Sequence, residues 1–222
     1  MKSFVFCHDQ KIADKSKLNN LLPDLQWVML GNNKFTSGII ARKLKSNIEN
    51  HPYLVAYTGW FALAHNGFIE PEEQYAMLEY DVIVPNTFAS VVNQYIVPQQ
   101  IIGFIPYNID HILFLGGTPL LYSSIMETYS IDCTKVIYKE TIKDRRLWCA
   151  TSNCVIKGSY IYDFVEWFDK LIPSFKRNPQ AGHIPERAIR IWMALNNIEP
   201  LCLAGLLKHE QRKSHGIEAA IV

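Results

Sequence analysis

Two carboxylates separated by one residue are the part of this sequence best suited to chemistry. Residues 74–85 read Gln-Tyr-Ala-Met-Leu-Glu-Tyr-Asp-Val-Ile-Val-Pro, so an apolar run leads into Glu79 and Asp81 and then resumes until Pro85. In a β-strand, residues i and i+2 point to the same face, which predicts that both carboxylates project together from a buried strand. Buried charges need partners, and oxygen ligands suit a hard divalent cation. The pattern predicts a metal site; the alternative is an exposed edge where both acids pair with surface Lys or Arg.

The composition is that of an ordinary folded protein. The chain has 222 residues, of which 49% are hydrophobic and 19% charged, which excludes a disordered chain and allows one substantial α/β domain or two small ones. With a net charge of +1, the chain lacks the excess of positive charge that is typical of proteins that bind nucleic acid. No apolar run approaches the ~18 residues of a membrane span. The five cysteines are an odd number without a Cys-x-x-Cys spacing, so we expect a soluble protein of the reducing cytoplasm.

Apolar segments that suit strands alternate with segments that suit helices. Strands are expected at residues 4–7, 27–30, 112–115, 135–138 and 155–156, and in the run that leads into Glu79. Helices are expected at residues 40–48, 53–65, 163–171 and 184–195. This alternation indicates an α/β fold with a largely parallel sheet.

The acid motif and the order of the expected strands and helices resemble those of the nucleotide-sugar glycosyltransferases of the GT-A fold. The hallmark of that group is an Asp-x-Asp-type motif at the end of a central strand, which Glu79-Tyr80-Asp81 resembles, with Glu in place of the first Asp. Residues 50–66 resemble the aromatic helix that precedes the motif, and residues 207–216 resemble the late histidine segment that closes the metal site. Length and layout are similar to the small glycosyltransferase domain encoded by large chlorella viruses.

The resemblance implies a fold and an activity. The fold would be a single GT-A-like (Rossmann-like) α/β domain, with a mixed, mostly parallel central sheet flanked by helices. Residues 1–85 would form the nucleotide-binding half and residues 86–222 the acceptor half. The protein would transfer a hexose or deoxyhexose from a nucleotide sugar, expected to be a UDP-sugar, to a hydroxyl group of a glycan acceptor. Its cofactor would be Mn²⁺ or Mg²⁺, and a viral enzyme would act in the host cytoplasm.

The metal ligands implied by the resemblance come from two distant parts of the chain. Asp81 is the expected direct ligand, and Glu79 would bind the metal through water or hold the ribose hydroxyls. His209 is the expected third ligand, since imidazole binds Mn²⁺ readily whereas Mg²⁺ prefers oxygen. We favour His209 over His215 because of the resemblance and because His209 follows the apolar run of residues 201–207, with one lysine between them.

The nucleotide should bind at the carboxyl ends of the first strands. Tyr57 is expected to stack on uracil, with a hydrogen bond from Thr58 nearby, and Arg42 or Lys43 is expected to meet the phosphates. A basic helix face that is only solvated is the alternative for Arg42 and Lys43. A purely structural position, in the core or on the surface, is the alternative for every other residue expected in this pocket. The base and ribose would lie against the residues that end the first strand, namely Cys7, His8 and Asp9.

Two candidate catalytic residues are expected in the acceptor half of the chain. Residues 148–153 resemble the segment that faces the donor sugar, which makes Asn153 a candidate catalytic residue. Glu186 lies one residue after Pro185 at the start of an expected helix, where it would accept the proton of the acceptor hydroxyl as a general base. The alternative for Glu186 is simple helix electrostatics, because acids are favoured in a first turn.

Two other functions remain open on the sequence. A carbohydrate-binding domain would use the many aromatic residues without catalysis. A nucleotidyltransferase that makes nucleotide sugars is the other alternative. Such an enzyme is expected to have a Gly-rich loop containing Lys or Arg near the N-terminus, and the sequence has none there.

Overall fold

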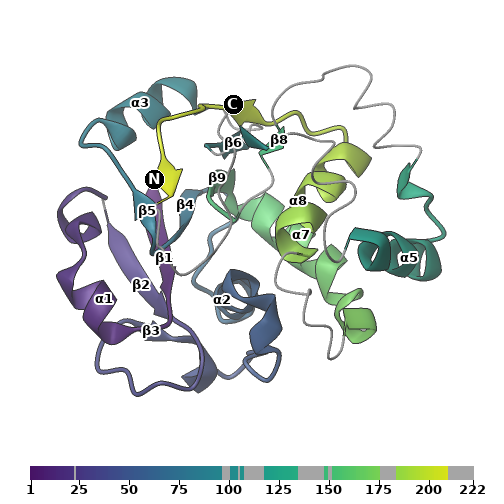
Figure 1. Cartoon of the computed structure of the whole chain (residues 1–222), viewed down its shortest axis with the longest axis horizontal. Coiled ribbons are helices and arrows are strands. Elements are labelled where there is room, and N and C mark those ends of the chain that lie inside the picture. Colours follow the sequence, from purple (N-terminus) through teal and green to yellow (C-terminus); the bar gives the residue numbers. More distant parts are fainter. Residues whose placement is uncertain are drawn as a thin grey trace.

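The computed structural model describes residues 1–22, 24–96, 101–104, 106–107, 118–134, 148–149, 152–175 and 184–209. A seven-stranded sheet in the order β10-β6-β9-β4-β1-β2-β3 forms the centre of the molecule (Figure 1). Its strands are β1 (Lys2–Cys7), β2 (Leu25–Met29), β3 (Ile39–Ile40), β4 (Gln74–Glu79), β6 (Ile102–Gly103), β9 (Cys154–Lys157) and β10 (Leu201–Cys202). In this sheet β9 runs antiparallel to its neighbours β4 and β6, and the other pairs are parallel. The mixed, mostly parallel sheet predicted from the sequence is confirmed.

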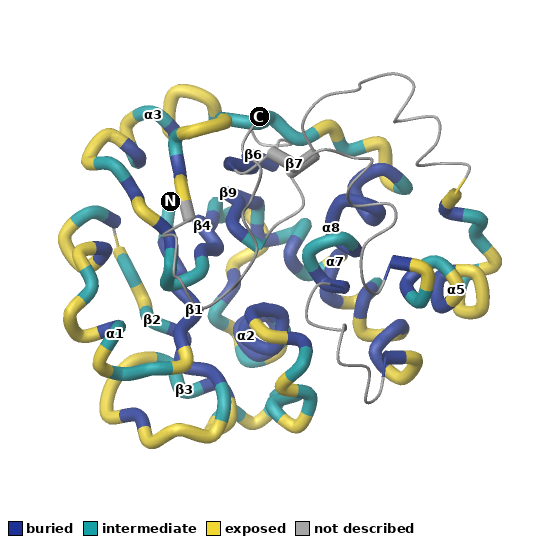
Figure 2. Tube along the Cα trace, viewed as in Figure 1, coloured by how far each residue is buried: buried dark blue, intermediate teal, exposed yellow. Residues whose placement is uncertain are grey.

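Both faces of the sheet are covered, which explains why the central strands carry runs of consecutive apolar residues. Successive side chains of β1 point to opposite faces, so Phe4 and Phe6 enter one core and Val5 enters another. The first core is built with α2 (Ala56–His65), α7 (Gly158–Asp169) and α8 (Ile184–Leu195). The second is built with α3 (Phe88–Tyr95). Figure 2 shows the buried central strands between exposed outer segments.

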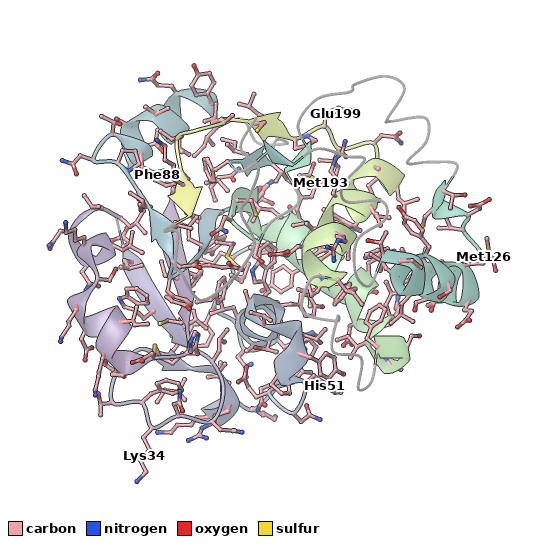
Figure 3. The ribbon with its side chains drawn as sticks, in the orientation of Figure 1. Lys34, His51, Phe88, Met126, Met193 and Glu199 are labelled. Atoms are coloured by element: carbon pink, nitrogen blue, oxygen red, sulfur yellow. The ribbon has the colours of Figure 1, made fainter. Side chains whose placement is uncertain are left out.

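The remaining elements lie around this frame. Helix α5 (Thr118–Tyr129) packs against α8 at the far edge of the molecule, and α1 (Gln10–Lys15) follows β1. Two small sheets pair β5 (Val82–Ile83) with β11 (Lys208–His209), and β7 (Pro106–Tyr107) with β8 (Trp148–Cys149). In Figure 3, Phe88 and Met193 are buried on separate helices, whereas Lys34 and Met126 lie at the periphery.

The helix expected at residues 40–48 is wrong. The chain forms only a 3₁₀ turn there, η2 (Ala41–Lys43), and continues in extended conformation at Leu44. The side-chain amide of Asn47 donates to the carbonyl of Leu44 at 2.9 Å. A short polar side chain that bonds to nearby backbone competes with helical hydrogen bonds, which apolar periodicity alone does not reveal.

The helix expected at residues 53–65 is divided. A 3₁₀ turn, η3 (Pro52–Leu54), ends at Val55, whose φ of 48° lies in the left-handed region, and α2 then begins at Ala56. The helix at 184–195 is confirmed as α8. The helix expected at 163–171 overlaps α7, which begins earlier, at Gly158, and ends earlier, at Asp169. The strands expected at 112–115 and 135–138 lie outside the described residues.

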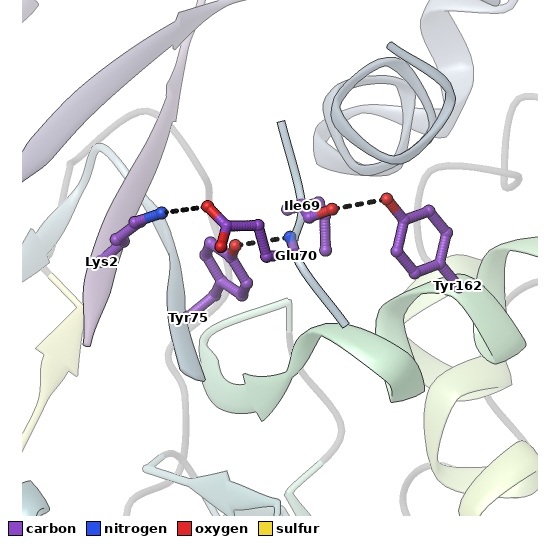
Figure 4. Close-up of polar contacts among 5 residues, drawn as sticks. All are labelled: Lys2, Ile69, Glu70, Tyr75 and Tyr162. Carbon is purple, nitrogen blue, oxygen red and sulfur yellow. Dashed lines mark hydrogen bonds and ion pairs between the residues drawn. The ribbon is translucent and has the colours of Figure 1, made fainter. Parts of the chain in front are cut away.

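The turn between α2 and β4 is fixed to the start of α7. The N–H of Gly158 donates to the carbonyl of Glu73 at 2.8 Å. The hydroxyl of Tyr162 donates to the carbonyl of Ile69 at 2.6 Å, and the N–H of Glu70 donates to the hydroxyl of Tyr75 at 2.7 Å (Figure 4). These bonds hold α7 and β4 in one position relative to each other.

Candidate functional site

The loops that follow three parallel strands lie at one edge of the sheet. β1 ends at Cys7, β2 ends at Met29 and β4, the central strand, ends at Glu79. Beyond the strand ends, the N–H of Leu30 donates to the carbonyl of Cys7 at 2.8 Å, and the N–H of Tyr80 donates to the carbonyl of Phe6 at 3.1 Å. In open α/β sheets, ligands bind outside the carboxyl ends of the strands, so this edge is the candidate site.

The acid motif lies at this edge, but only its first residue belongs to a strand. Glu79 is the last residue of β4, and Asp81 lies in the turn that leads to β5. The expectation that a continuous strand carries both acids on one buried face is wrong, because the strand pairing ends before Asp81. Both residues are half-buried. A half-buried carboxylate keeps access to a ligand and avoids the full desolvation of a buried charge.

The end of the described chain returns to the acid motif. β11 pairs antiparallel with β5, and the register sets His209 opposite Val82, the residue that follows Asp81 (Figure 1). Residues 209 and 82 are far apart in the sequence, so this contact exists only in the folded chain. His215 lies outside the described residues. Of the two histidines that the sequence singled out, the structure brings the backbone of His209 beside the motif.

Asn153 joins the motif from the other side. Its side-chain oxygen accepts a hydrogen bond from the backbone N–H of Glu79 at 2.7 Å. The antiparallel register of β9, with Cys154 opposite Met77, carries Asn153 to the end of β4. Only 1% of Asn153 is exposed to solvent, so its contact with Glu79 is made inside the protein.

The residues that follow β1 form a compact turn beside the motif. The Cys7 thiol is buried and donates to the carbonyl of Asp9 at 3.2 Å. Asp9 caps α1 by accepting the N–H of Lys11 at 2.8 Å. The exposed His8 ring meets the Tyr80 ring edge-on, with centroids 4.9 Å apart. The structure therefore brings the predicted residues of the first strand to the acid motif.

Two predicted nucleotide residues lie in the core instead of at this edge. Tyr57 is 2% exposed, and its ring packs edge-on against Phe168 at 4.4 Å. Its hydroxyl donates to the carbonyl of Val165 at 3.2 Å, and burial raises its pKa well above the usual value. Thr58 is equally buried and donates to the carbonyl of Val55 at 2.9 Å. Neither side chain offers an accessible surface to a base.

Arg42 is exposed near the loop that follows β2. Its guanidinium donates to the side-chain oxygen of Asn32 at 3.5 Å. Glu49, which sequence reasoning missed, lies at the same loop and accepts the N–H of Gly31 at 2.5 Å. No local motif marks Glu49, because only the fold brings it to the end of β2.

The start of α8 approaches the same region. Glu186 is half-buried in its first turn. Pro185 and Ser152, which precede Glu186 and Asn153 in the sequence, line one pocket. Because the residues that precede them line the same pocket, Glu186 and Asn153 lie in the same part of the protein.

The donor set fits a hard divalent cation in part. Glu79 and Asp81 supply half-buried carboxylates, the ligands preferred by Mg²⁺ and Mn²⁺, and the β5–β11 register adds the His209 backbone beside them. Among the side chains that the structure describes, which do not include that of His209, no group of three or more His, Cys, Asp or Glu residues is arranged to hold a metal ion. A cation held by Glu79 and Asp81 would therefore need a further ligand from outside the described side chains.

The architecture is that of a GT-A-like glycosyltransferase fold. The chain is similar to the apo structure of WbbM, a bifunctional glycosyltransferase, with a TM-score of 0.70 at 12% sequence identity. The match covers 96% of this chain and 45% of that protein, so the chain spans less than half the length of this neighbour. No protein-family model matches the sequence, and neither does any curated protein. No helix within the described ranges is long and apolar enough to cross a membrane.

Proposed function

We propose that this chain is a metal-dependent glycosyltransferase of the cytoplasm. It would transfer a sugar from a nucleotide-sugar donor, a UDP-sugar, to a hydroxyl group of a glycan. The observation that carries the proposal is the pairing of β11 with β5, which returns His209 to the residue next to Asp81 at the carboxyl edge of the sheet. The likeness in fold to a glycosyltransferase supports the same class of reaction.

The donor half of the reaction belongs to the edge formed by β1, β2 and β4. Asp81 and His209 would hold a Mn²⁺ or Mg²⁺ ion, and Glu79 would bind it through water or hold the ribose. A bound cation would neutralise the negative charge that grows on the departing diphosphate. His8 and Asp9 would lie against the nucleoside, and exposed Arg42 would meet the phosphates.

The acceptor half belongs to the segment before β9 and the start of α8. Asn153 would position the acid motif through its bond to the Glu79 N–H. Glu186 would take the proton of the attacking hydroxyl as the sugar–phosphate bond breaks. In this proposal residues 1–85 supply the donor site and residues 86–222 supply the acceptor site of one domain.

The direct test is a panel of nucleotide sugars, incubated with Mn²⁺ and candidate glycan acceptors, with release of the nucleoside diphosphate as the readout. We expect one UDP-sugar to be consumed. Asp81→Asn keeps the size of the side chain but removes its charge, and should abolish consumption. Asp163→Asn, on the exposed side of α7, is the matched control and should be fully active. Equal consumption by both variants would contradict the proposal.

A carbohydrate-binding domain without catalysis is the second candidate, and the many aromatic residues of the sequence favour it. Such a domain would bind glycan without nucleotide or metal.

A further inference from the structure

The segment between Asp24 and Glu49 carries positive charges and no negative ones. Residues 25–48 contain four basic residues and no Asp or Glu, although the whole chain has a net charge of only +1. All four side chains belong to exposed residues, and Figure 3 shows Lys34 at the periphery of the molecule. The four residues, here called the basic patch, are Lys34, Arg42, Lys43 and Lys45.

The fold gathers the basic patch around the outermost strand of the sheet. β3 is an edge strand that pairs only with β2. Lys34 lies in the loop before β3, whereas Arg42 and Lys43 lie in η2, directly after it. The guanidinium of Arg42 donates to the side-chain oxygen of Asn32 at 3.5 Å, which connects the two flanks of β3. The patch therefore lies beside the carboxyl end of β2.

Hydrogen bonds hold the backbone that carries these charges. The side-chain oxygen of Gln10, in α1, accepts the N–H of Thr36 at 3.0 Å and the N–H of Ser37 at 3.3 Å. On the other side of β3, the side-chain amide of Asn47 donates to the carbonyl of Leu44 at 2.9 Å. The backbone is thus already ordered, and binding does not have to supply the free energy of ordering it.

The cations of the patch are not neutralised by ion pairs. No member of the patch forms an ion pair with any residue that the structure describes. Three lysines elsewhere in the molecule do form such pairs, namely Lys2 with Glu70 at 2.7 Å, Lys157 with Glu72 at 2.7 Å and Lys170 with Glu166 at 3.4 Å. The excess of positive charge is therefore a property of this surface and not of lysines in general.

The neighbouring helix α1 does not remove the excess. The side-chain amide of Gln10 donates to Asp14 at 2.8 Å and also bonds to the loop before β3, so Asp14 lies close to the patch. The exposed Lys11 and Lys15 offset the charges of Asp9 and Asp14. The surface formed by α1 and the patch keeps its positive charge.

The side chains among the cations favour a lipid surface over nucleic acid. Ile39, Ile40 and Leu44 are half-buried, so apolar atoms lie between the charges at the surface. Basic residues combined with apolar ones suit the interface of an anionic membrane. Single-stranded nucleic acid binds on exposed aromatic rings, but Phe35, the aromatic residue of this segment, is only 9% exposed.

We propose that the basic patch docks this protein on an anionic membrane surface, where the negative head groups lie against Lys34, Lys43 and Lys45. The docking is reversible and needs neither nucleotide nor metal, so it does not rest on the proposed function. Because the patch flanks the carboxyl end of β2, the bound membrane would lie beside the candidate site.

Sedimentation with lipid vesicles tests the docking. The full chain is mixed with vesicles of phosphatidylcholine alone, or of equal parts phosphatidylcholine and phosphatidylglycerol, without nucleotide. We expect binding only to the vesicles that contain phosphatidylglycerol. Raising the salt from about 0.05 M to about 0.5 M should weaken it strongly, because salt screens exposed charges.

Substitution locates the surface. Each Lys or Arg near an anionic membrane strengthens binding about 5-fold, which corresponds to about 1 kcal/mol. Combined Lys34→Gln, Lys43→Gln and Lys45→Gln should therefore weaken vesicle binding about 100-fold, whereas Lys→Arg at the same three positions should retain it. Arg42 is left unchanged because it is proposed to meet the donor phosphates.

The matched control has the same net charge as the triple Gln variant. It combines Lys2→Gln, Lys157→Gln and Lys170→Gln, which lie outside the patch, and should bind vesicles as the wild type does. Equal weakening by the two triple variants would overturn the proposal, because net charge and not the patch would then drive binding.

Two further results would also overturn it. One is a wild-type protein that binds no anionic vesicle at about 0.05 M salt. The other is a patch-dependent affinity for fluorescent oligonucleotides without affinity for vesicles, which would assign the surface to nucleic acid. Vesicle binding by a protein that never binds UDP would support the docking surface and count only against the proposed function.

Discussion

The side-chain oxygen of Asn153 accepts the backbone N–H of Glu79 across 2.7 Å. Seventy-four positions of sequence separate these residues, and the bond connects the end of the central strand to the segment that precedes β9. Because Asn153 is buried, the bond fixes the backbone of the acid motif without competition from water. The orientation of Glu79 and Asp81 therefore depends on a residue from the opposite half of the chain.

Replacement of Asn153 by Ala should destabilise the fold. The Glu79 N–H would lose its acceptor in a buried setting, and we expect the free energy of unfolding to fall by about 1–3 kcal/mol. Urea denaturation monitored by circular dichroism measures the change. Asn93→Ala, at an exposed position of α3, should stay within about 0.5 kcal/mol of the wild type. A similar value for Asn153→Ala would show that the bond contributes nothing.

Gly158→Ala should reverse the usual effect of this substitution in a helix. Ala is ordinarily favoured over Gly by about 1 kcal/mol in a helix interior. Here an added Cβ would lie 2.0 Å from the carbonyl oxygen of Glu70, a backbone atom that cannot move without breaking the bonds in Figure 4. We expect a loss of stability of about 1–3 kcal/mol or more, as for overpacked cores.

Thermal and urea unfolding of Gly158→Ala provide the measurement, and Ser159→Ala at the next position is the control. A stabilised Gly158→Ala protein would mean that the start of α7 does not approach the Glu70 turn as closely as described.

The sequence predicted the frame of the fold better than its site. Continuous apolar runs predicted β1, β2 and β4, because a strand buried on both faces is apolar at successive positions. Apolar residues at helical spacing predicted α8. The helix expected around Leu44 failed because Asn47 bonds to the backbone there. Such local competition depends on side-chain hydrogen bonds that a pattern of apolar residues does not contain.

The sequence predicted only some of the residues of the candidate site, for a related reason. Glu79 and Asp81 stand out because charges interrupt an apolar run, and the first-strand residues follow from chain order. Glu49 reaches the end of β2 only through the folded path of the chain. Tyr57 was expected to stack on the base because it is aromatic, but its ring packs in the core beside Phe168.

Stability should fall as the pH rises above about 9. Burial raises the pKa of the Cys133 thiol from 9.0 to about 11, and burial raises the pKa of Cys154 further still. The unfolded chain loses these thiol protons first, so it binds fewer protons than the folded chain, and the free energy of unfolding decreases with pH. Each group contributes at most about 1.4 kcal/mol per pH unit.

Urea unfolding between about pH 8 and about pH 10.5 checks this pH dependence. Cys133→Ala should flatten the decline, because Ala does not titrate in either state. Cys202→Ala, at a half-buried position, is the control and should leave the slope of the wild type. A free energy of unfolding that stays constant or rises over this range would contradict the burial of both thiols.

Glu186→Gln tests the acceptor side of the proposed reaction. If the transfer inverts the anomeric centre, loss of the general base should lower the chemical rate by ~10²–10⁴-fold while UDP affinity stays unchanged. Single-turnover rates and product stereochemistry by NMR give the answer. Glu127→Gln, on the exposed face of α5, should be as fast as the wild type. A product with retained anomeric configuration, or a Glu186→Gln rate within a few-fold of the wild-type rate, would show that Glu186 is not the general base.

Calorimetric titration of UDP with Mn²⁺ and with excess chelator tests the central claim most directly, because it needs neither the sugar nor the acceptor. The account predicts tight binding only with the metal, a sharp loss in Asp81→Asn, and a larger loss in His209→Ala than in His215→Ala. His209 is singled out because its strand pairs beside Asp81. UDP that binds equally well in chelator, or that binds Asp81→Asn as it binds the wild type, would contradict a metal-dependent nucleotide site at this edge of the sheet.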